Sequence, residues 1–192
     1  MQGGHRNYPA SGQSVLLPLK LHSGNQGNVA AEVLICGGSA HTDFYTKGNE
    51  GVHYVALQDY GRMRITDLNL VWKRDLMPSP RLMGDMLLLP SSDVLLINGA
   101  KRGSSGWGFA RNPNFTPAIY NPRVKRGERF RKLAPTTIPR MYHSTATVLQ
   151  DDKSSSPATT PTTGTSMKPN GPGGSEAQWA WSLNHRCLDP AQ

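Results

Sequence analysis

The chain has 192 residues and a formal net charge of +8, with 20 glycines and 15 prolines but only 18% charged residues. This length allows one domain with a hydrophobic core, and the glycine and proline content is typical of short strands and tight turns rather than of long helices. No run of about 20 apolar residues is present, and the first residues lack the apolar stretch of a secretory signal, so we expect neither a membrane span nor an export signal.

Six short segments are apolar or alternating and are bounded by Gly, Pro, Asn or Ser, which predicts β-strands. In chain order these segments are residues 14–21, 31–39, 83–90, 93–100, 116–121 and 144–150. No segment shows a comparable helical pattern. The sequence therefore predicts an all-β fold.

Two motifs recur at nearly the same spacing. VLICGG at 33–38 returns as VLLING at 94–99, which is 61 residues later. PRLMGD at 80–85 returns as PRMYHS at 139–144, which is 59 residues later. Repeats slightly shorter than this are typical of kelch propellers, in which each repeat forms a four-stranded blade.

With this period, residues 14–74 and 83–133 form two blades, and one further strand begins at Met141. We therefore predict a partial kelch-type β-propeller within residues 1–152. The composition then changes, because 20 of the 39 residues from Ser154 onward are Ser, Thr, Pro or Gly. Such a segment cannot bury enough apolar surface to offset chain entropy, so residues 153–192 are predicted to be a low-complexity, disordered tail.

The densest basic run lies between two predicted strands, at residues 123–132. It includes Glu128 and offers only Phe130 as an aromatic side chain, whereas single-stranded nucleic acids are generally bound by basic and stacking side chains together. We interpret the run as a solvated loop rather than as a phosphate-binding patch, and we predict no nucleic-acid partner.

Five separated motifs resemble the glyoxal oxidases and related plant galactose-oxidase-like proteins, in family order. They are NYPASGQSVLLPL at 7–19, VLICGG at 33–38, GRMRITD at 61–67, PSPRLMGDMLLLPSSDVLLINGA at 78–100 and PRMYHSTATVLQD at 139–151. The resemblance implies a copper-radical oxidase that oxidises a small aldehyde or primary alcohol with oxygen and releases hydrogen peroxide. It also implies an extracellular or cell-wall location.

The adjacent Tyr142 and His143 match two copper ligands of that family. A neutral imidazole suits copper, and a phenolate can accept the hydroxyl proton of a substrate as a general base. The resemblance thus implies that Tyr142 is catalytic and that Tyr142 and His143 bind one copper ion. Both can reach one metal only where the backbone bends, because adjacent side chains of a regular strand point to opposite faces. The alternative interpretation is a buried tyrosine and a hydrogen-bonded histidine at a blade edge.

The resemblance also implies a second histidine ligand and a tyrosine cross-linked to a cysteine, and neither is matched. The remaining histidines lie in no recognisable ligand motif; they are His5, His22, His41, His53 and His185. Tyr60 stands where the family pattern has a cysteine, so a disulfide partner of Cys36 is absent. We therefore expect a truncated oxidase that is inactive as an isolated chain and self-associates through open propeller edges. The alternative is a kelch-like binding or scaffold module without redox chemistry.

Overall fold

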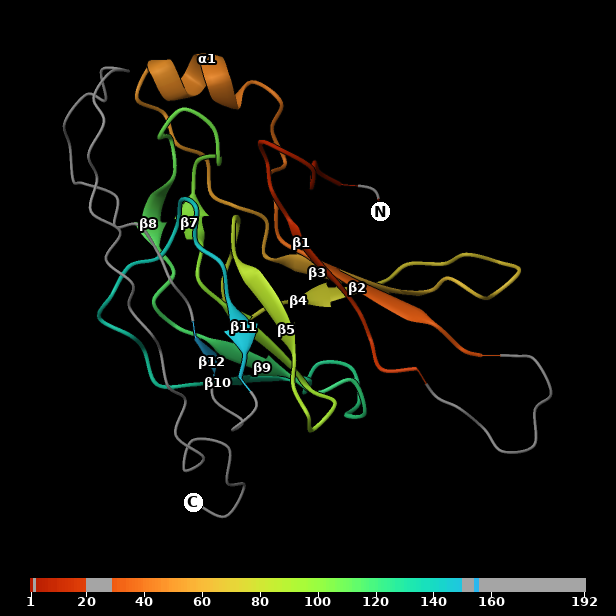
Figure 1. Ribbon diagram of the computed structural model, residues 1–192. Coiled ribbons are helices and arrows are strands. Elements are labelled where there is room, and N and C mark those ends of the chain that lie inside the picture. Colours follow the sequence, from red (N-terminus) through yellow and green to blue (C-terminus); the bar gives the residue numbers. More distant parts are fainter. Residues whose placement is uncertain (2, 20–28, 150–153, 156–192) are drawn as a thin grey trace.

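The computed structural model describes residues 1, 3–19, 29–149 and 154–155. Two four-stranded antiparallel sheets dominate it (Figure 1). The first sheet contains, in spatial order, β1 (Gln13–Leu16), β2 (Glu32–Cys36), β3 (Asp59–Arg64) and β4 (Lys73–Leu76). The second contains β5 (Asp85–Leu88), β6 (Val94–Ile97), β9 (Ala118–Tyr120) and β10 (Phe130–Lys132). Each sheet follows the chain from strand to strand, which is the arrangement of a propeller blade.

The other elements are short. A hairpin of β7 (Ala100–Arg102) and β8 (Arg111–Pro113) is inserted after β6, and β11 (Thr147–Val148) pairs with β12 (Ser154–Ser155). The helix α1 (Phe44–Asn49) lies between β2 and β3. No helix of the described residues is long and apolar enough to cross a membrane.

The prediction of an all-β, partial propeller is confirmed, with two four-stranded blades; the further strand, β11, is paired with β12. The kelch type of the repeat and the boundary at residue 152 stay predictions, and the predicted tail lies outside the described residues apart from β12. The helix α1 was not predicted. At six residues it is too short to show a helical period or to be stable alone, and its Gly48 packs directly against the ring of Phe109.

The repeated motifs VLICGG and VLLING share a backbone conformation. In each blade the second strand ends in two consecutive residues with positive φ, Gly37 (+66°) with Gly38 (+104°) and Asn98 (+61°) with Gly99 (+89°). Glycine and asparagine adopt this left-handed region with the least steric penalty, which explains why they recur at these positions.

The second repeated motif binds these glycine-ended strands. The amide of Gly38 donates to the carbonyl of Arg81 (3.1 Å), and the amide of Gly99 donates to the carbonyl of Arg140 (2.8 Å). Each Pro-Arg segment is thus fastened to the preceding blade before the chain enters the next one. The two sequence repeats are therefore two sides of one recurring contact.

The main core lies between the two blades. It joins Leu17, Leu34, Cys36, Tyr60 and Met77 of the first blade and its flanks to Val94, Leu96 and Tyr120 of the second. A second cluster covers the opposite face of the second blade, with Leu95 and Ile97 packed near Val148 of β11. Because β6 is buried on both faces, its sequence is a continuous apolar run rather than an alternating one.

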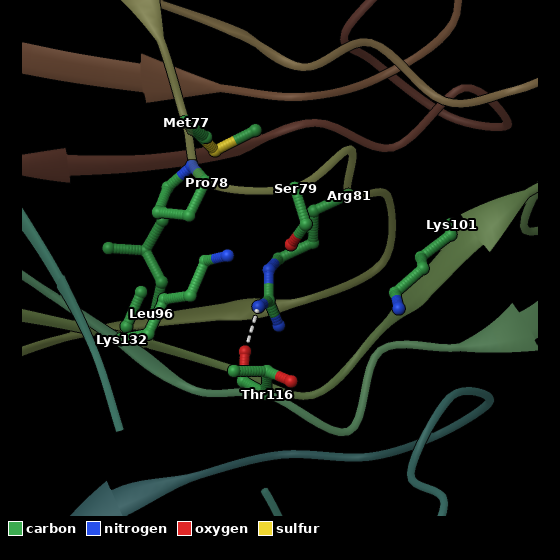
Figure 2. Close-up of a pocket in the computed structure, with 9 residues that line it drawn as sticks. Met77, Pro78, Ser79, Arg81, Leu96, Lys101, Thr116 and Lys132 are labelled. Carbon is green, nitrogen blue, oxygen red and sulfur yellow. Dashed lines mark hydrogen bonds between the residues drawn. The ribbon is translucent and has the colours of Figure 1, made fainter. Parts of the chain in front are cut away.

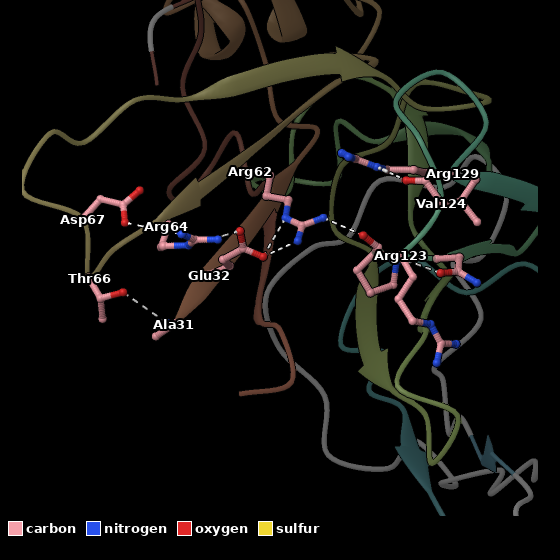
Figure 3. Close-up of polar contacts among 11 residues, drawn as sticks. Ala31, Glu32, Arg62, Arg64, Thr66, Asp67, Arg123, Val124 and Arg129 are labelled. Carbon is pink, nitrogen blue, oxygen red and sulfur yellow. Dashed lines mark hydrogen bonds and ion pairs between the residues drawn. The ribbon is translucent and has the colours of Figure 1, made fainter. Parts of the chain in front are cut away.

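Polar contacts join the outer parts of the blades (Figure 3). Arg62 of β3 donates to Glu32 through Nε (3.0 Å) and to the carbonyl of Pro122 in the β9–β10 loop (2.8 Å). The basic loop itself is tied to acids of both blades, since Arg123 pairs with Asp93 (3.2 Å) and Arg126 pairs with Asp75 (3.6 Å). These pairs fit the interpretation of the run as a solvated loop.

Candidate functional site

Tyr142 and His143 form a turn that precedes β11. His143 has a φ of +52°, so the backbone is not extended there, and the rule that adjacent side chains point to opposite faces does not apply. Similar positive φ values occur at Met83 (+54°) and Ser11 (+46°), just before β5 and β1. The turn is therefore a recurring feature of the blade start, and here it carries a phenol and an imidazole.

The phenol of Tyr142 is half-buried and held by the backbone of the β7–β8 hairpin. Its Oη accepts a hydrogen bond from the amide of Ala110 (2.5 Å) and makes a long donor contact to the carbonyl of Ser104 (3.5 Å). The ring packs on a small apolar cluster that includes Leu82 and Met141. The hairpin thus fixes the position of Tyr142 Oη, the oxygen to which the family resemblance assigns a catalytic role.

Two opposing influences act on the acidity of this phenol. Burial raises the pKa of Tyr142, whereas the Ala110 amide and the positive charge of Arg111 lower it, and Tyr8 adds a smaller upward effect. A hydrogen bond donated to the oxygen favours the phenolate form. The backbone amide is therefore placed to stabilise Tyr142 Oη once the proton has left.

His143 is exposed to solvent. A phenolate oxygen and an imidazole nitrogen are both suitable donors for copper, so the pair fits that metal chemically. Within the described ranges no three His, Cys, Asp or Glu residues come together as a metal site. The pair would therefore provide two of the donors of a copper ion, and the other ligands implied by the resemblance are not among the described residues.

Of the other histidines, three are described and two lie outside the described residues. His5 is exposed and its backbone bridges to Ser39, while His41 stacks on Tyr54 with ring centroids 3.7 Å apart. Burial, followed by the charges of Arg111 and Arg102, lowers the pKa of His53. His22 and His185 are not described.

An aromatic cluster adjoins the Tyr142 oxygen. Tyr45 of α1 contacts Trp107 edge-on at 4.6 Å, and Phe109 lies 6.1 Å from Tyr45 and 6.3 Å from Trp107. Phe109 directly precedes Ala110, whose amide binds Tyr142. Trp107 is 60% exposed. Sequence analysis missed Tyr45 and Phe109 because nothing in their local pattern links α1 to the hairpin.

Comparisons with known proteins agree over most of the chain. The glyoxal oxidase N-terminus family matches residues 1–161. The chain is 46% identical over 153 residues to aldehyde oxidase GLOX1 of Arabidopsis thaliana, an alignment that covers 80% of this chain and 25% of that protein. It is 42% identical over 154 residues to aldehyde oxidase GLOX of Vitis pseudoreticulata, covering 80% and 28%. The chain thus spans about a quarter of the length of these relatives.

The fold resembles that of a fungal alcohol oxidase of the AA5 family solved in complex with copper. The TM-score is 0.53 at 19% sequence identity, and the match covers 67% of this chain and 24% of that one. At that identity the likeness concerns the fold alone. The family model covers residues 1–161, which is more than half of the chain. The chain belongs to the glyoxal oxidase N-terminus family.

Proposed function

We propose that this chain provides the propeller portion of a copper-radical oxidase of the glyoxal oxidase type. The protein would convert an aldehyde, water and oxygen to an acid and hydrogen peroxide, or a primary alcohol and oxygen to an aldehyde and hydrogen peroxide. The observation that carries the proposal is the 46% identity to an aldehyde oxidase over 153 residues. Because the relatives are about three times as long as this chain, activity belongs to the whole protein. We propose that the protein acts outside the cell or in the cell wall.

In this proposal Tyr142 and His143 would hold the copper ion, and the ion would supply redox chemistry there. Tyr142 Oη also accepts the hydroxyl proton of the substrate. The amide of Ala110, at 2.5 Å, is directed at that oxygen. Burial destabilises the charged phenolate, whereas the hydrogen bond from the amide stabilises it. Because the two effects oppose each other, the same oxygen can hold or release a proton.

We further propose that the chain alone does not turn over substrate. Two donors leave a copper ion under-coordinated, and the resemblance implies a second histidine and a cysteine-linked tyrosine that the described residues do not provide. Glyoxal, methylglyoxal and galactose would then yield no hydrogen peroxide with the copper-loaded full chain. Peroxide that requires copper and is lost in Tyr142→Phe would contradict this part while supporting the oxidase assignment.

Copper binding tests the assignment of the ligands. The full chain is titrated with Cu²⁺ and followed by calorimetry and by the visible absorption of a phenolate bound to Cu²⁺. We expect Tyr142→Phe to remove the absorption band and His143→Ala to weaken binding by about tenfold or more, which corresponds to ~1.4 kcal/mol. His5→Ala is the control, because His5 is also exposed but lies outside the turn.

If all three variants bind Cu²⁺ like the unaltered chain, the turn is not a copper site. The alternative of a kelch-like binding or scaffold module would then be favoured. Loss of binding in His5→Ala alone would also contradict the proposal, because it would place the metal at a different part of the chain.

A further inference from the structure

A cavity of about 240 Å³ lies between the two blades, and neither Tyr142 nor His143 lines it (Figure 2). One side is formed by the segment that follows β4, including Ser79, and the other by the second blade, including Thr116. Its lining contains three basic side chains, Arg81, Lys101 and Lys132, and no acidic one. An uncompensated group of like charges around a cavity favours a ligand of opposite charge.

Arg81 forms the fixed part of this site. Its side chain is one of the largest that are fully buried, with 2% exposed. The guanidinium donates to the carbonyls of Asn98 and, at 2.8 Å, Thr116, and neither acceptor carries a charge. Burial lowers the pKa of Arg81 to about 10, so it remains protonated at neutral pH. Asp85, the carboxylate whose charge acts on Arg81, does not line the cavity and accepts a hydrogen bond from Asn98 at 2.7 Å.

The two lysines border the cavity on either side of Arg81, Lys101 from β7 and Lys132 from β10 (Figure 2). None of the ion pairs found among the described residues includes either lysine. Elsewhere on these blades arginines such as Arg62 and Arg123 do have carboxylate partners. The positive charge at the cavity is therefore a local excess.

Ser79 adds a neutral donor to the lining. Its Oγ accepts a hydrogen bond from Asn114 Nδ2 at 2.9 Å, which leaves the hydroxyl proton available for a second partner. Ammonium and hydroxyl groups together are the donors that commonly bind carboxylate and phosphate oxygens. The volume is smaller than that of pockets for drug-sized molecules, which are roughly 300–1,000 Å³. The cavity therefore suits an anion of few atoms.

We propose that this cavity is a binding site for a small oxyanion. The anion would lie between Lys101 and Lys132, and the buried charge of Arg81 would attract it. The oxygen atoms of the anion accept charge-assisted hydrogen bonds from the two ammonium groups and a hydrogen bond from Ser79. This site requires neither copper nor the Tyr142 turn, so failure of the oxidase proposal would leave it unaffected, and the reverse is also true. Carboxylates and phosphate share the recognition chemistry, and the experiment separates them.

The test is calorimetric titration of the full chain with oxalate and, separately, with inorganic phosphate, at low ionic strength. We expect saturable binding of at least one of them, with one anion per chain. Lys101→Gln and Lys132→Gln should each weaken the binding by about three- to tenfold, and the double variant by more. Lys73→Gln is the matched control, because Lys73 is an exposed strand lysine that does not line the cavity.

A footprint on the unaltered chain gives a second readout that needs no folded variant. Acetic anhydride is added with and without the bound anion, and the acetylation of individual lysines is measured by mass spectrometry. The anion should slow the acetylation of Lys101 and Lys132 while leaving Lys73 and Lys125 unaffected. If oxalate protects the two lysines at a lower concentration than phosphate, the site prefers a carboxylate; the opposite order indicates a phosphate.

Three outcomes overturn the proposal. The first is no saturable binding of either anion up to about 10 mM, which corresponds to a binding free energy of only ~3 kcal/mol. The second is unchanged affinity in the folded double variant, as judged by circular dichroism. The third is equal loss of affinity in Lys73→Gln or equal protection of all lysines, since either would show diffuse attraction to a basic protein rather than a site.

Discussion

Cys36 and Tyr60 lie directly opposite each other on β2 and β3. The next pair along these strands is Gly37 and Asp59, and the amide of Gly37 donates a hydrogen bond to the carbonyl of Asp59 (3.1 Å). Cys36 and Tyr60 therefore form a non-hydrogen-bonded pair, in which Cα atoms are typically ~4.5 Å apart, within the range that a disulfide spans. The resemblance implies a cysteine at position 60, and the register places that position across from Cys36.

Tyr60→Cys is expected to form a disulfide with Cys36. The reduced variant should lose ~3–5 kcal/mol of unfolding free energy, because Tyr60 is 1% exposed and packs on the rings of Tyr120 (5.5 Å) and Phe130 (5.3 Å). Oxidation should recover ~3 kcal/mol, since the disulfide closes a loop of about 25 residues. Urea unfolding with and without reductant measures both effects.

Tyr60→Ser is the control for the disulfide, because it removes the same ring without adding a thiol. Its stability should not depend on reductant. If Tyr60→Cys keeps both thiols free under oxidising conditions in a thiol assay, the register of β2 and β3 is wrong.

Gly99→Ala should destabilise the chain more than Gly51→Ala. Both glycines have positive φ, +89° and +80°, so each substitution adds backbone strain of about 1 kcal/mol. A Cβ on Gly99 would also lie 2.3 Å from the carbonyl oxygen of Leu82, whereas one on Gly51 would meet nothing within 4 Å. Thermal unfolding should show an additional loss of ~1–3 kcal/mol for Gly99→Ala. Equal losses would mean that the segment before β5 does not approach Gly99 closely.

The apolar strands of the fold were predictable, and the outer strands were harder to recognise. β6 reads VLLI because both of its faces are buried, and such a run predicts a strand without further information. β4 reads KRDL and is mostly exposed, so its pattern does not differ from that of a polar loop. Its strand conformation comes from pairing with β3, which is a tertiary effect.

The candidate site was predictable only at the residues that carry the family motif. Tyr142 and His143 directly follow a repeated Pro-Arg segment, and this repeat predicted their position at the start of a blade. The contact from Ala110 could not be predicted, because it uses a backbone amide that nearly every residue type provides. The contact between Tyr45 and Trp107 joins segments that are 62 positions apart, and no periodic pattern connects them.

Asp85→Asn is expected to change how stability depends on pH. Burial raises the pKa of Asp85, while the hydrogen bond from Asn98 and the charge of Arg81 partly oppose this. A folded pKa above the unfolded value of 3.8 means that the folded state binds the proton more tightly. The stabilisation is then present below pH 3.8 and is lost as the pH rises through the folded pKa.

The asparagine variant lacks this titration, so its stability relative to the unaltered chain should increase from acid to neutral pH. Urea unfolding at several pH values measures the difference. Asp67→Asn is the control for charge removal, because its side chain is 50% exposed in a turn. A constant difference between Asp85→Asn and the unaltered chain across the pH range would contradict the burial of this carboxyl.

The first blade has an apolar face that points away from the second. Leu17 and Met77 belong to the core between the blades, so their neighbours Leu16 and Leu76 lie on the other face, where they are 48% and 64% exposed. Blades of a propeller normally bury both faces against neighbours, and exposed apolar sheet faces favour association. We therefore expect the full chain to self-associate.

Replacing Leu16 and Leu76 together with lysine should reduce this association without disturbing the interblade core. Light scattering during thermal unfolding should begin at a higher temperature in the double variant, and the unfolding midpoint itself should change little, because both side chains are largely exposed. Leu68→Lys is the matched control, since Leu68 is 103% exposed in the turn between β3 and β4 and should leave the scattering unchanged. The unaltered chain could instead remain a monomer at all concentrations and unfold reversibly without scattering. This result would mean that the exposed face of the first blade does not drive association, and that the described strands are sufficient for a stable domain.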